Sequence, residues 1–469
     1  MKKFMKTAAL IVAAAVALPI YAAHGTADFS RLVILGDSYG AGYESGSLNE
    51  RHQVFSWGAT LAKQVGLQIC APTASATDNC FAVPLVSYPG IPAEPTLGIN
   101  GPVPGTGSGV PLMAGFGRPY NNLSVPGITL GGAQVLTGAE PNTGLAPLIL
   151  RGLGTEVDQA LSLHPTFVAI WLGGNDFLGA VSQGNPALLT SPATFAAQYK
   201  ALLDKISAGA PSAGIAVGTL PENFASSPLT GALPPVVFDQ NFQPVHFTPL
   251  GGATVPLFYL PAGSATPAAV PAGSVVLLSA LPKIQTGFGI PPTLAAFPPF
   301  NAMPNVGKPL TDADIITPAE IATFDSTIAA YNATITSEAS ARGIAVADIR
   351  GLFASFVMAT PNGPVRANLQ VGPFTFTNQF ILGGLFSLDG VHLTDIGYTL
   401  FANQYIKAIN ATYGTHIPLA NISQFLQNND PALNSTRGFS LPPEFGAAMT
   451  QVFTSITLPA PPARRHSAH

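Results

Sequence analysis

Charged side chains are scarce in this chain of 469 residues. Asp, Glu, Lys and Arg together make up 9% of it, and the formal net charge is -4. The chain has no run of basic residues that could neutralise the phosphates of a nucleic acid, so its composition argues against a nucleic-acid partner. Beyond the N-terminus it also lacks a hydrophobic run, free of Pro and Gly, that could cross a bilayer, which takes about 20 residues. We therefore expect no transmembrane span in the mature chain.

Cysteine is nearly absent, with only Cys70 and Cys80 in the sequence. No cluster of histidines accompanies them to complete the four ligands of a zinc site, so we expect no metal at this pair. Their even number and close spacing instead favour one disulfide that closes a small loop, provided that the chain reaches an oxidising compartment. Two free thiols are the alternative.

The N-terminus predicts such export. Residues 1–23 combine three lysines, an apolar run and small residues at positions 22 and 23, which is the pattern of a secretory signal peptide with its cleavage site. An uncleaved N-terminal anchor is the alternative, although the apolar run over residues 8–20 is short for a membrane span. We expect a secreted or periplasmic protein.

Glycine and proline, by contrast, are abundant, at 48 and 45 residues, which predicts long ordered loops. Two proline-punctuated segments, about 82–120 and 221–310, are too hydrophobic to be solvated linkers. We interpret them as insertions in one domain spanning residues 24–435. They pack either near the strand ends, where α/β sheets bind ligands, or elsewhere as added scaffold. The C-terminal tail, residues 436–469, has no pattern that we can interpret.

Short apolar runs without clean alternation predict buried strands with both faces covered. These runs occupy residues 31–37, 166–172, 214–220 and 344–348. Helical patterns lie between them. Ser191 and Thr317 each precede a proline and an apolar helical pattern, as helix caps do, and a last helix is expected to begin at Thr394. This alternation predicts an α/β fold with a doubly wound parallel sheet.

The first strand runs into Gly36-Asp37-Ser38. Asp and Ser are common helix caps, and a cap explains the pair without any chemistry. A serine that opens a helix also has an unpaired backbone N–H, which together with the helix dipole can stabilise a developing oxyanion. Ser38 is therefore a candidate nucleophile that carries its own oxyanion donor.

Two further segments offer hydrogen-bond donors to an oxyanion. Gly127 has no Cβ, so a substrate could approach its N–H closely, although a Pro-Gly turn explains it equally well. Gly173 and Asn175 directly follow the strand 166–172, which would place the Asn175 amide at the tip of the sheet. An Asn cap on the next helix is the alternative.

A fourth segment contains Asp389 and His392, three residues apart with Gly390 between them. In a tight turn the carboxylate could hold one imidazole nitrogen, while the other nitrogen takes the proton of the serine during attack. An isolated Asp-x-x-His pair is more often incidental, or a pair of metal ligands. Its position just before a capped helix distinguishes it from the other histidines of the chain.

Taken together, Gly36-Asp37-Ser38, Gly127, Gly173-x-Asn175 and Asp389-x-x-His392 resemble the four signature blocks of the GDSL, or SGNH, hydrolases, over roughly residues 31–408. This resemblance implies a three-layer α/β/α, flavodoxin-like fold. The sequence differs from the GDSL pattern at one position, because Tyr39 occupies the place of the Leu that follows the serine. A side chain at this position could shape the pocket.

The resemblance also implies roles for individual residues. Ser38 would be the nucleophile, His392 the base and Asp389 the residue that orients it. The Ser38 N–H, the Gly127 N–H and the Asn175 side chain would form the oxyanion hole, with Asp37 and Gly173 supporting them. No metal and no organic cofactor is implied.

The sequence therefore predicts a secreted carboxylic ester hydrolase, of the esterase or lipase type, that forms an acyl-enzyme. The apolar insertion at 221–310 favours an acyl or lipid-like ester over a sugar acetate. A carbohydrate O-acetylesterase and a non-catalytic binding module on the same fold are the alternatives.

The string Gly36-x-Ser38-x-Gly40 also matches the elbow of the α/β-hydrolases. However, that elbow normally follows several strands, and its Asp usually lies well before its His.

Overall fold

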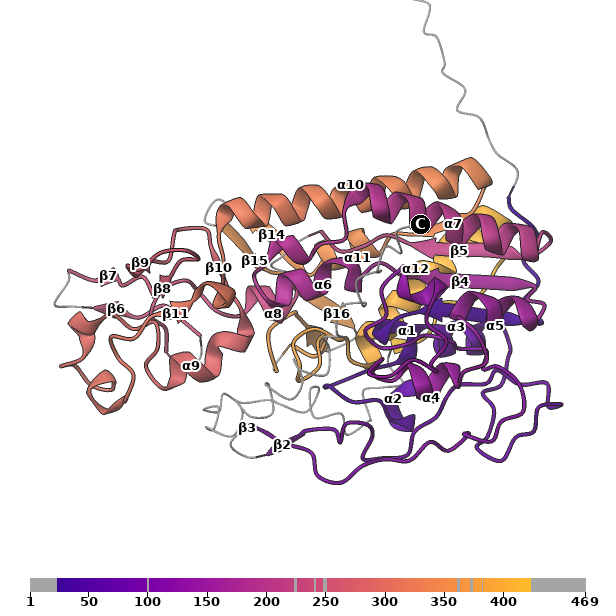
Figure 1. The fold of residues 1–469 in the computed structure, drawn as a ribbon, viewed down its shortest axis with the longest axis horizontal. Helices are drawn as coiled ribbons and strands as arrows, with labels where there is room; N and C mark the ends of the chain where they lie inside the picture. Colours follow the sequence, from indigo (N-terminus) through magenta and orange to yellow (C-terminus); the bar gives the residue numbers. More distant parts are fainter. Residues whose placement is uncertain are drawn as a thin grey trace, which may run out of the picture.

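A computed structural model of the chain shows how these segments are arranged in space (Figure 1). The structure describes residues 23–98, 101–222, 226–239, 242–247, 251–360, 363–371, 374–381 and 383–422. The predicted signal peptide, apart from its last residue, and the tail from residue 436 lie outside these ranges.

A parallel sheet forms the centre of the molecule. Its strands lie in the order β1 (Leu32–Gly36), β4 (Phe167–Trp171), β5 (Gly214–Gly218) and β13 (Ala345–Ala347). Residues 121–125 add a further extended segment beside β1, with Asn122 in a parallel bridge to Ile34. The resulting order is that of a flavodoxin-like sheet, with the first strand second from one edge.

Helices cover both faces of this sheet. On one face, α3 (Trp57–Gln64) packs against α12 (Asp395–Tyr413), and the ring of Trp57 stacks on that of Tyr405 with their centroids 4.4 Å apart. On the other face lie α5 (Glu156–Ser162), α7 (Pro192–Gly209) and α10 (Pro318–Arg342). Every residue of β1, β4 and β5 is buried between these layers. The predicted three-layer α/β/α fold is therefore confirmed.

The predicted helix starts are also confirmed. Ser191 accepts a hydrogen bond from the N–H of Thr194 at the start of α7, and Thr317 forms a capping box with Glu320 at the start of α10. Thr394 likewise caps α12. In each case a hydroxyl satisfies a backbone donor that has no partner within the helix.

The first insertion runs mostly as loop, with one hairpin made of β2 (Thr96–Gly98) and β3 (Gly101–Val103). Several of its apolar side chains, such as Val83, Val86 and Phe116, are buried in the main core. Just before it, Cys70 and Cys80 are joined by a disulfide. This segment is thus part of the scaffold.

The second insertion is a lobe with a hydrophobic cluster of its own, seen at the left of Figure 1. Its elements continue past the predicted end at 310. They are α8 (Pro228–Gly231), β6 (His246–Phe247), β7 (Ala253–Thr254), β8 (Phe258–Leu260), β9 (Ala268–Ala269), β10 (Val275–Val276), α9 (Leu281–Gln285), β11 (Leu310–Thr311) and β12 (Ile315–Ile316).

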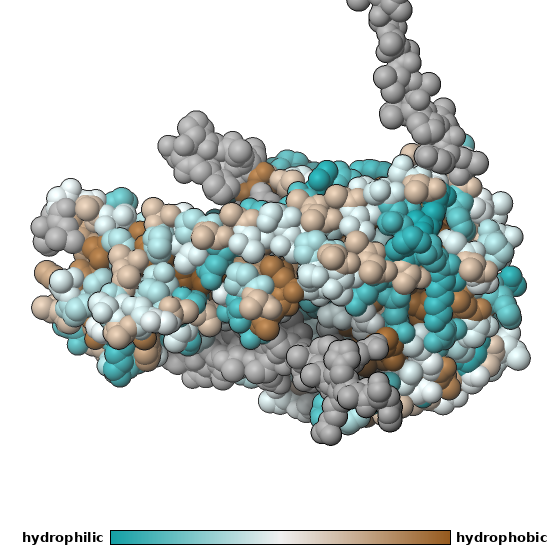
Figure 2. All heavy atoms as spheres, turned by 45° about the horizontal axis from the view of Figure 1, so that its top comes forward, coloured by the Kyte–Doolittle hydropathy of each residue, from teal (hydrophilic) through white to brown (hydrophobic). Residues whose placement is uncertain are grey.

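The remaining elements are short. They are α1 (Ser38–Ala41), α2 (Glu50–Gln53), α4 (Ala146–Leu150), α6 (Asn175–Ser182), α11 (Ile349–Ala354), and two hairpins, β14 (Val357–Thr360) with β15 (Gly363–Arg366) and β16 (Leu369–Val371) with β17 (Phe374–Phe376). Among the described helices, none is both long and apolar enough to cross a bilayer. The face drawn in Figure 2 mixes hydrophilic and hydrophobic residues, and its apolar patches are small and scattered.

Candidate active site

Ser38 stands where the chain leaves β1 and enters α1. Its side chain is almost fully buried, and Asp37 caps the turn by accepting a hydrogen bond from the N–H of Tyr39 at 3.0 Å. Two residues later, a Cβ on Gly40 would lie 2.2 Å from Ser124 Oγ. The glycine is therefore required by close packing of this turn against the neighbouring segment, and the match to an α/β-hydrolase elbow has this separate explanation.

Asp37 is a buried carboxyl whose charge is poorly solvated. Burial raises its pKa to about 8, and the nearby Asp176 contributes further in the same direction. Burial likewise raises the pKa of Asp176 to about 6. This raised pKa favours the neutral form of Asp37, which supports the turn without placing a negative charge beside Ser38.

Asp389 and His392 form a tight turn that satisfies every acceptor position of the carboxylate. Asp389 Oδ1 accepts from the N–H groups of Val391 and His392, each at 2.8 Å. Asp389 Oδ2 accepts from the N–H of Gly46 and lies 2.8 Å from His392 Nδ1. Burial raises the pKa of Asp389, but the imidazole and these hydrogen bonds outweigh burial and hold the pKa below its usual value.

This geometry fixes the tautomer of His392. Because Asp389 is ionised and can only accept, Nδ1 must carry a hydrogen, so that in the neutral imidazole the lone pair is on Nε2. Within the described part of the chain, this buried Nε2 has no hydrogen-bond partner. The imidazole is therefore arranged as a proton acceptor.

Two aromatic residues join the Ser38 turn to the His392 turn. Tyr39 OH donates to the carbonyl of Val391 at 2.6 Å, and the Tyr39 ring lies 5.5 Å from the imidazole between centroids. The N–H of Tyr43 donates to the Ser38 carbonyl, and the Tyr43 ring lies 5.0 Å from the imidazole. The structure thus brings the segments of Ser38 and His392 side by side, although more than 350 residues separate them along the chain.

The three predicted oxyanion donors lie around the same turn. Among the described residues, the N–H groups of Ser38 and Gly127 have no acceptor in the protein. Asn175 Nδ2 donates to the carbonyl of Ile128, next to Gly127, at 2.9 Å, and contacts Asp37 Oδ2 at 3.4 Å. The second contact is long for a hydrogen bond, so Asp37 holds this N–H only weakly.

Steric contacts require a glycine at position 173, two residues before Asn175. Gly173 has φ +114°, in the left-handed region, and a Cβ there would lie 2.8 Å from the ring of Phe195. Only glycine fits this sharp exit from β4, which leads directly into α6. Gly173 therefore positions Asn175 and has no side chain to take part in chemistry.

A cavity of about 80 Å³ lies beside Ser38 and Asn175. Apolar side chains form most of its wall. They are Tyr39, Trp171, Phe177, Leu178, Val181, Leu229, Ile328, Phe353 and Val391. The site can thus exclude water from a small uncharged group bound next to the hydroxyl.

The second insertion also holds the turn that contains Asp389 and His392, which the sequence did not predict. Ser227 Oγ donates to the carbonyl of Gly390 at 2.7 Å, and the N–H of Leu229 donates to the same oxygen at 2.9 Å. A Cβ on Gly390 would lie 2.7 Å from Leu278 Cδ2. The apolar composition of the insertion was its only signal in the sequence, and it did not indicate this contact.

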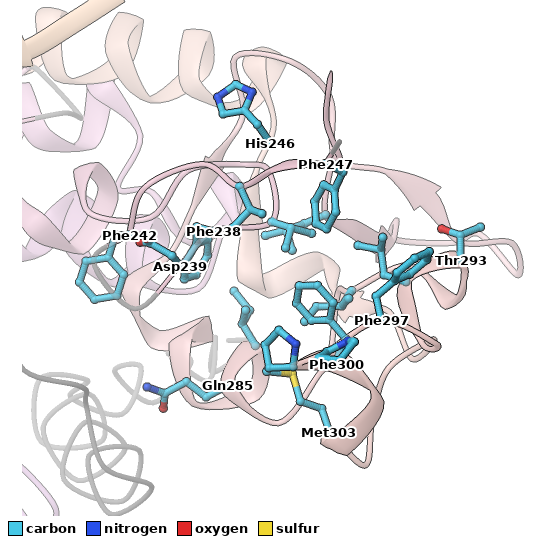
Figure 3. A pocket seen from close by; sticks show the side chains of 18 of the residues that line it. Phe238, Asp239, Phe242, His246, Phe247, Gln285, Thr293, Phe297, Phe300 and Met303 are labelled. Atoms are coloured by element: carbon cyan, nitrogen blue, oxygen red, sulfur yellow. The ribbon is translucent and has the colours of Figure 1, made fainter. Parts of the chain in front are cut away.

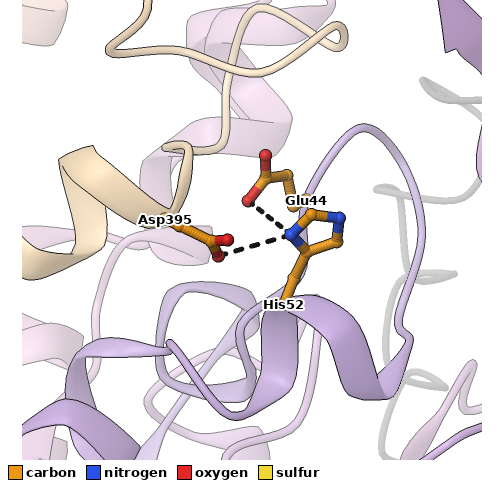
Figure 4. A group of neighbouring side chains, drawn as sticks. All are labelled: Glu44, His52 and Asp395. Atoms are coloured by element: carbon orange, nitrogen blue, oxygen red, sulfur yellow. Dashed lines mark hydrogen bonds and ion pairs between the residues drawn. The ribbon is translucent and has the colours of Figure 1, made fainter. Parts of the chain in front are cut away.

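A second buried cluster of titratable groups surrounds His52 on α2 (Figure 4). His52 Nδ1 lies 3.2 Å from Glu44 Oε2 and 3.3 Å from Asp395 Oδ1, while Nε2 lies 3.1 Å from Glu94 Oε1. Burial lowers the pKa of His52, but these carboxylates outweigh it and hold the pKa well above its usual value.

The donor atoms of Glu44, His52 and Asp395 all lie within 4.8 Å of one another, a spacing that a metal ion could also use. Carboxylates face both ring nitrogens, however, so an imidazolium accounts for the arrangement. It ties the chain after α1 and the first insertion to the start of α12.

Comparison with known proteins adds a family match. Residues 32–244 match the model of the family described as GDSL-like Lipase/Acylhydrolase. The matched segment includes Ser38, Gly127 and Asn175, and it ends before Asp389 and His392. A search of curated proteins finds no match.

Similar solved structures include an extracellular lipase from Streptomyces rimosus, at 15% identity and a TM-score of 0.32, covering 81% of this chain and 98% of that chain. A phospholipase A1 from Streptomyces albidoflavus NA297 has 14% identity and a TM-score of 0.29, covering 83% and 100%. A family 3 carbohydrate esterase from Clostridium thermocellum has 13% identity and a TM-score of 0.30, covering 82% and 96%.

Proposed function

We propose that this chain, whose residues 32–244 match the family described as GDSL-like Lipase/Acylhydrolase, hydrolyses carboxylic esters through Ser38, His392 and Asp389. The observation that carries this proposal is the state of His392. Its Nδ1 is held by an ionised carboxylate, and its Nε2 is buried without a partner among the described residues, next to the turn that presents Ser38.

In the proposed reaction, Ser38 Oγ attacks the ester carbonyl while His392 Nε2 takes the hydroxyl proton. The carbonyl oxygen becomes an oxyanion that accepts from the Ser38 N–H, the Gly127 N–H and Asn175 Nδ2. His392 returns the proton to the alcohol as the C–O bond breaks, which leaves an acyl group on Ser38. His392 then takes a proton from water as the oxygen of that water attacks the acyl carbon. The bond between the acyl carbon and Ser38 Oγ breaks, His392 returns the proton to Ser38 Oγ, and the acid is released.

The cavity suggests which acyl groups fit. Its wall is mostly apolar, which favours an uncharged acyl group. Its volume of about 80 Å³ favours a short acyl group, whereas the sequence favoured an acyl or lipid-like ester over a sugar acetate. The small volume also supports a second candidate function, hydrolysis of acetyl esters on carbohydrates. An activity profile over acyl lengths, with an acetylated sugar as a further substrate, distinguishes the two.

Export is a further part of the proposal. The pattern of residues 1–23 is that of a signal peptide, and a disulfide is compatible with an oxidising compartment. Mass spectrometry of protein from the culture medium or periplasm is expected to find a mature N-terminus near residue 24. An intact N-terminus on cell-associated protein would instead indicate an uncleaved anchor.

The test of activity compares the wild type with Ser38→Ala on p-nitrophenyl esters from acetate to dodecanoate. Ser326→Ala, on the exposed side of α10, is the matched control. We expect a loss of at least about 1000-fold in kcat/KM for Ser38→Ala, no loss for the control, and the highest rates on short esters. Equal activity in wild type and Ser38→Ala would favour a non-catalytic binding module.

A further inference from the structure

The second insertion contains an open pocket of about 820 Å³, with exposed lining residues such as Thr293 and Phe297 (Figure 3). This volume lies within the range of about 300–1,000 Å³ that is typical of small-molecule sites. None of the residues that line it also lines the cavity beside Ser38. It is therefore a second site, separate from the proposed catalytic centre, and the ester-hydrolysis mechanism does not use it.

The walls of this cavity are built from a packed core. Leu257, Leu281 and Leu294 line it and are themselves buried in the hydrophobic cluster of the insertion. Aromatic rings complete the wall, and Figure 3 shows Phe247 and Phe300 close together within it. Aliphatic groups and aromatic faces of this kind favour an apolar ligand, because binding removes apolar surface from water.

The polar groups of the cavity indicate what the ligand does not carry. Asp239, His246, Gln285 and Thr293 are polar lining residues, and among the described residues that line the cavity there is no Lys or Arg. A carboxylate or phosphate head group would find no Lys or Arg among these described lining residues, and the Asp239 carboxylate would repel it. The charge pattern therefore fits an uncharged molecule.

We propose that this cavity binds an uncharged aliphatic chain, such as that of a long-chain alcohol or a neutral ester. The choice of an aliphatic ligand rests on the apolar wall and on the absence of Lys and Arg from the described lining residues, and binding itself does not require catalysis. Each CH₂ group transferred from water to the cavity is expected to raise the affinity roughly fourfold, which corresponds to about 0.8 kcal/mol.

The experiment measures binding of Nile red, a neutral dye whose fluorescence increases in apolar surroundings, to the full chain carrying Ser38→Ala. This substitution removes turnover, so binding is read independently of esterase activity. 1-Octanol, 1-decanol and 1-dodecanol are then titrated as competitors, with decanoate anion as the charged counterpart of 1-decanol. We expect the alcohols to displace the dye with a several-fold gain per CH₂, and decanoate to be at least tenfold weaker.

The same substitution in the two cavities locates the bound dye. Leu294→Trp fills the cavity in the insertion, and Leu178→Trp fills the cavity beside Ser38. We expect Leu294→Trp to weaken dye binding at least tenfold and Leu178→Trp to change it less than twofold. Thermal unfolding checks that each variant is folded, and Ile284→Phe, on another wall of the same cavity, replaces Leu294→Trp if that variant fails to fold.

Failure of dye binding in the parent protein would overturn the proposal. So would unchanged binding in a folded Leu294→Trp or Ile284→Phe variant, or a loss in Leu178→Trp as large as that in Leu294→Trp. Decanoate competing as well as 1-decanol would overturn the assignment to uncharged ligands. Absence of esterase activity in the wild type, with dye binding intact, would refute the proposed function alone.

Discussion

Replacement of Asp389 by Asn tests how the proposed catalytic turn works. The carboxylate accepts four hydrogen bonds, two on each oxygen, and all four donors are held by the fold. An amide has one oxygen and an NH₂ group that can only donate. Whichever way the new side chain is turned, its NH₂ group faces two of these positions, of which at least one is a backbone N–H.

Each orientation has a defined consequence. If the NH₂ replaces Oδ2, it faces the N–H of Gly46, and His392 Nδ1 must become an acceptor, which moves the imidazole hydrogen to Nε2 and removes the base. If it replaces Oδ1, it faces the N–H groups of Val391 and His392. One or two buried donors lose their acceptor, at about 1–3 kcal/mol each.

We therefore expect Asp389→Asn to lower the free energy of unfolding by about 2–4 kcal/mol. We also expect it to lower kcat/KM by about 1000- to 10,000-fold, the usual result of a wrong tautomer. Urea unfolding and hydrolysis of p-nitrophenyl acetate measure the two effects. The control is Asp314→Asn, a buried Asp in the insertion that accepts from Lys283 and Thr311. It should lose stability while keeping its activity. A folded Asp389→Asn variant within tenfold of wild-type activity would refute the assigned role of Asp389.

Three further predictions follow from single contacts. Tyr39→Phe leaves the buried carbonyl of Val391 without its hydrogen-bond donor, so kcat should fall about tenfold while KM stays nearly unchanged. A change confined to KM would contradict the role of Tyr39 in positioning the turn that contains His392. His52 has a folded pKa above its unfolded value of about 6.5, so its stabilisation is fully present below pH 6.5 and is lost as the pH rises through the folded pKa. The difference in melting temperature between the wild type and His52→Gln should therefore decrease above pH 6.5. A difference that stays constant or grows would show that His52 is not the charged partner of the surrounding carboxylates. Gly390→Ala adds a side chain to a residue with φ +71° and brings it against Leu278, which should lower the free energy of unfolding in urea by about 2–4 kcal/mol. If backbone strain dominates, adding Leu278→Ala to this variant should restore less than half of the lost free energy. Full restoration would assign the whole loss to the contact with Leu278.

Those parts of the fold that depend on local sequence were predictable. The strands β1, β4 and β5 are continuous apolar runs, and burial of both faces follows from that pattern alone. The helices α7 and α10 begin where a hydroxyl side chain precedes a proline, because that pair satisfies a backbone donor and fixes φ for the first turn.

The parts that depend on long-range contacts were not predictable. Residues 121–125 have no apolar run, and they join the sheet through backbone hydrogen bonds to β1. Most strands of the second insertion are two or three residues long and are held by the packing of that lobe. The hydrogen bond from Ser227 to Gly390 joins residues 163 positions apart, so no local pattern could indicate it.

For the candidate site, the sequence predicted the residues but not their surroundings. Ser38, Asp389 and His392 were predicted because their segments resemble a known pattern, and the structure brings these segments together. The tyrosine at position 39 could be singled out as a departure, but its hydrogen bond to Val391 follows only from the fold.

The most direct test of the account is the site and rate of labelling by a serine-directed alkyl phosphonate. Peptide mass spectrometry of the wild type should find one label per chain, on Ser38. In His392→Ala the rate of labelling should fall by at least about 1000-fold, because the hydroxyl has lost its proton acceptor. Labelling at another serine, or labelling of Ser38 at an unchanged rate in His392→Ala, would contradict the claim that these two residues act as nucleophile and base.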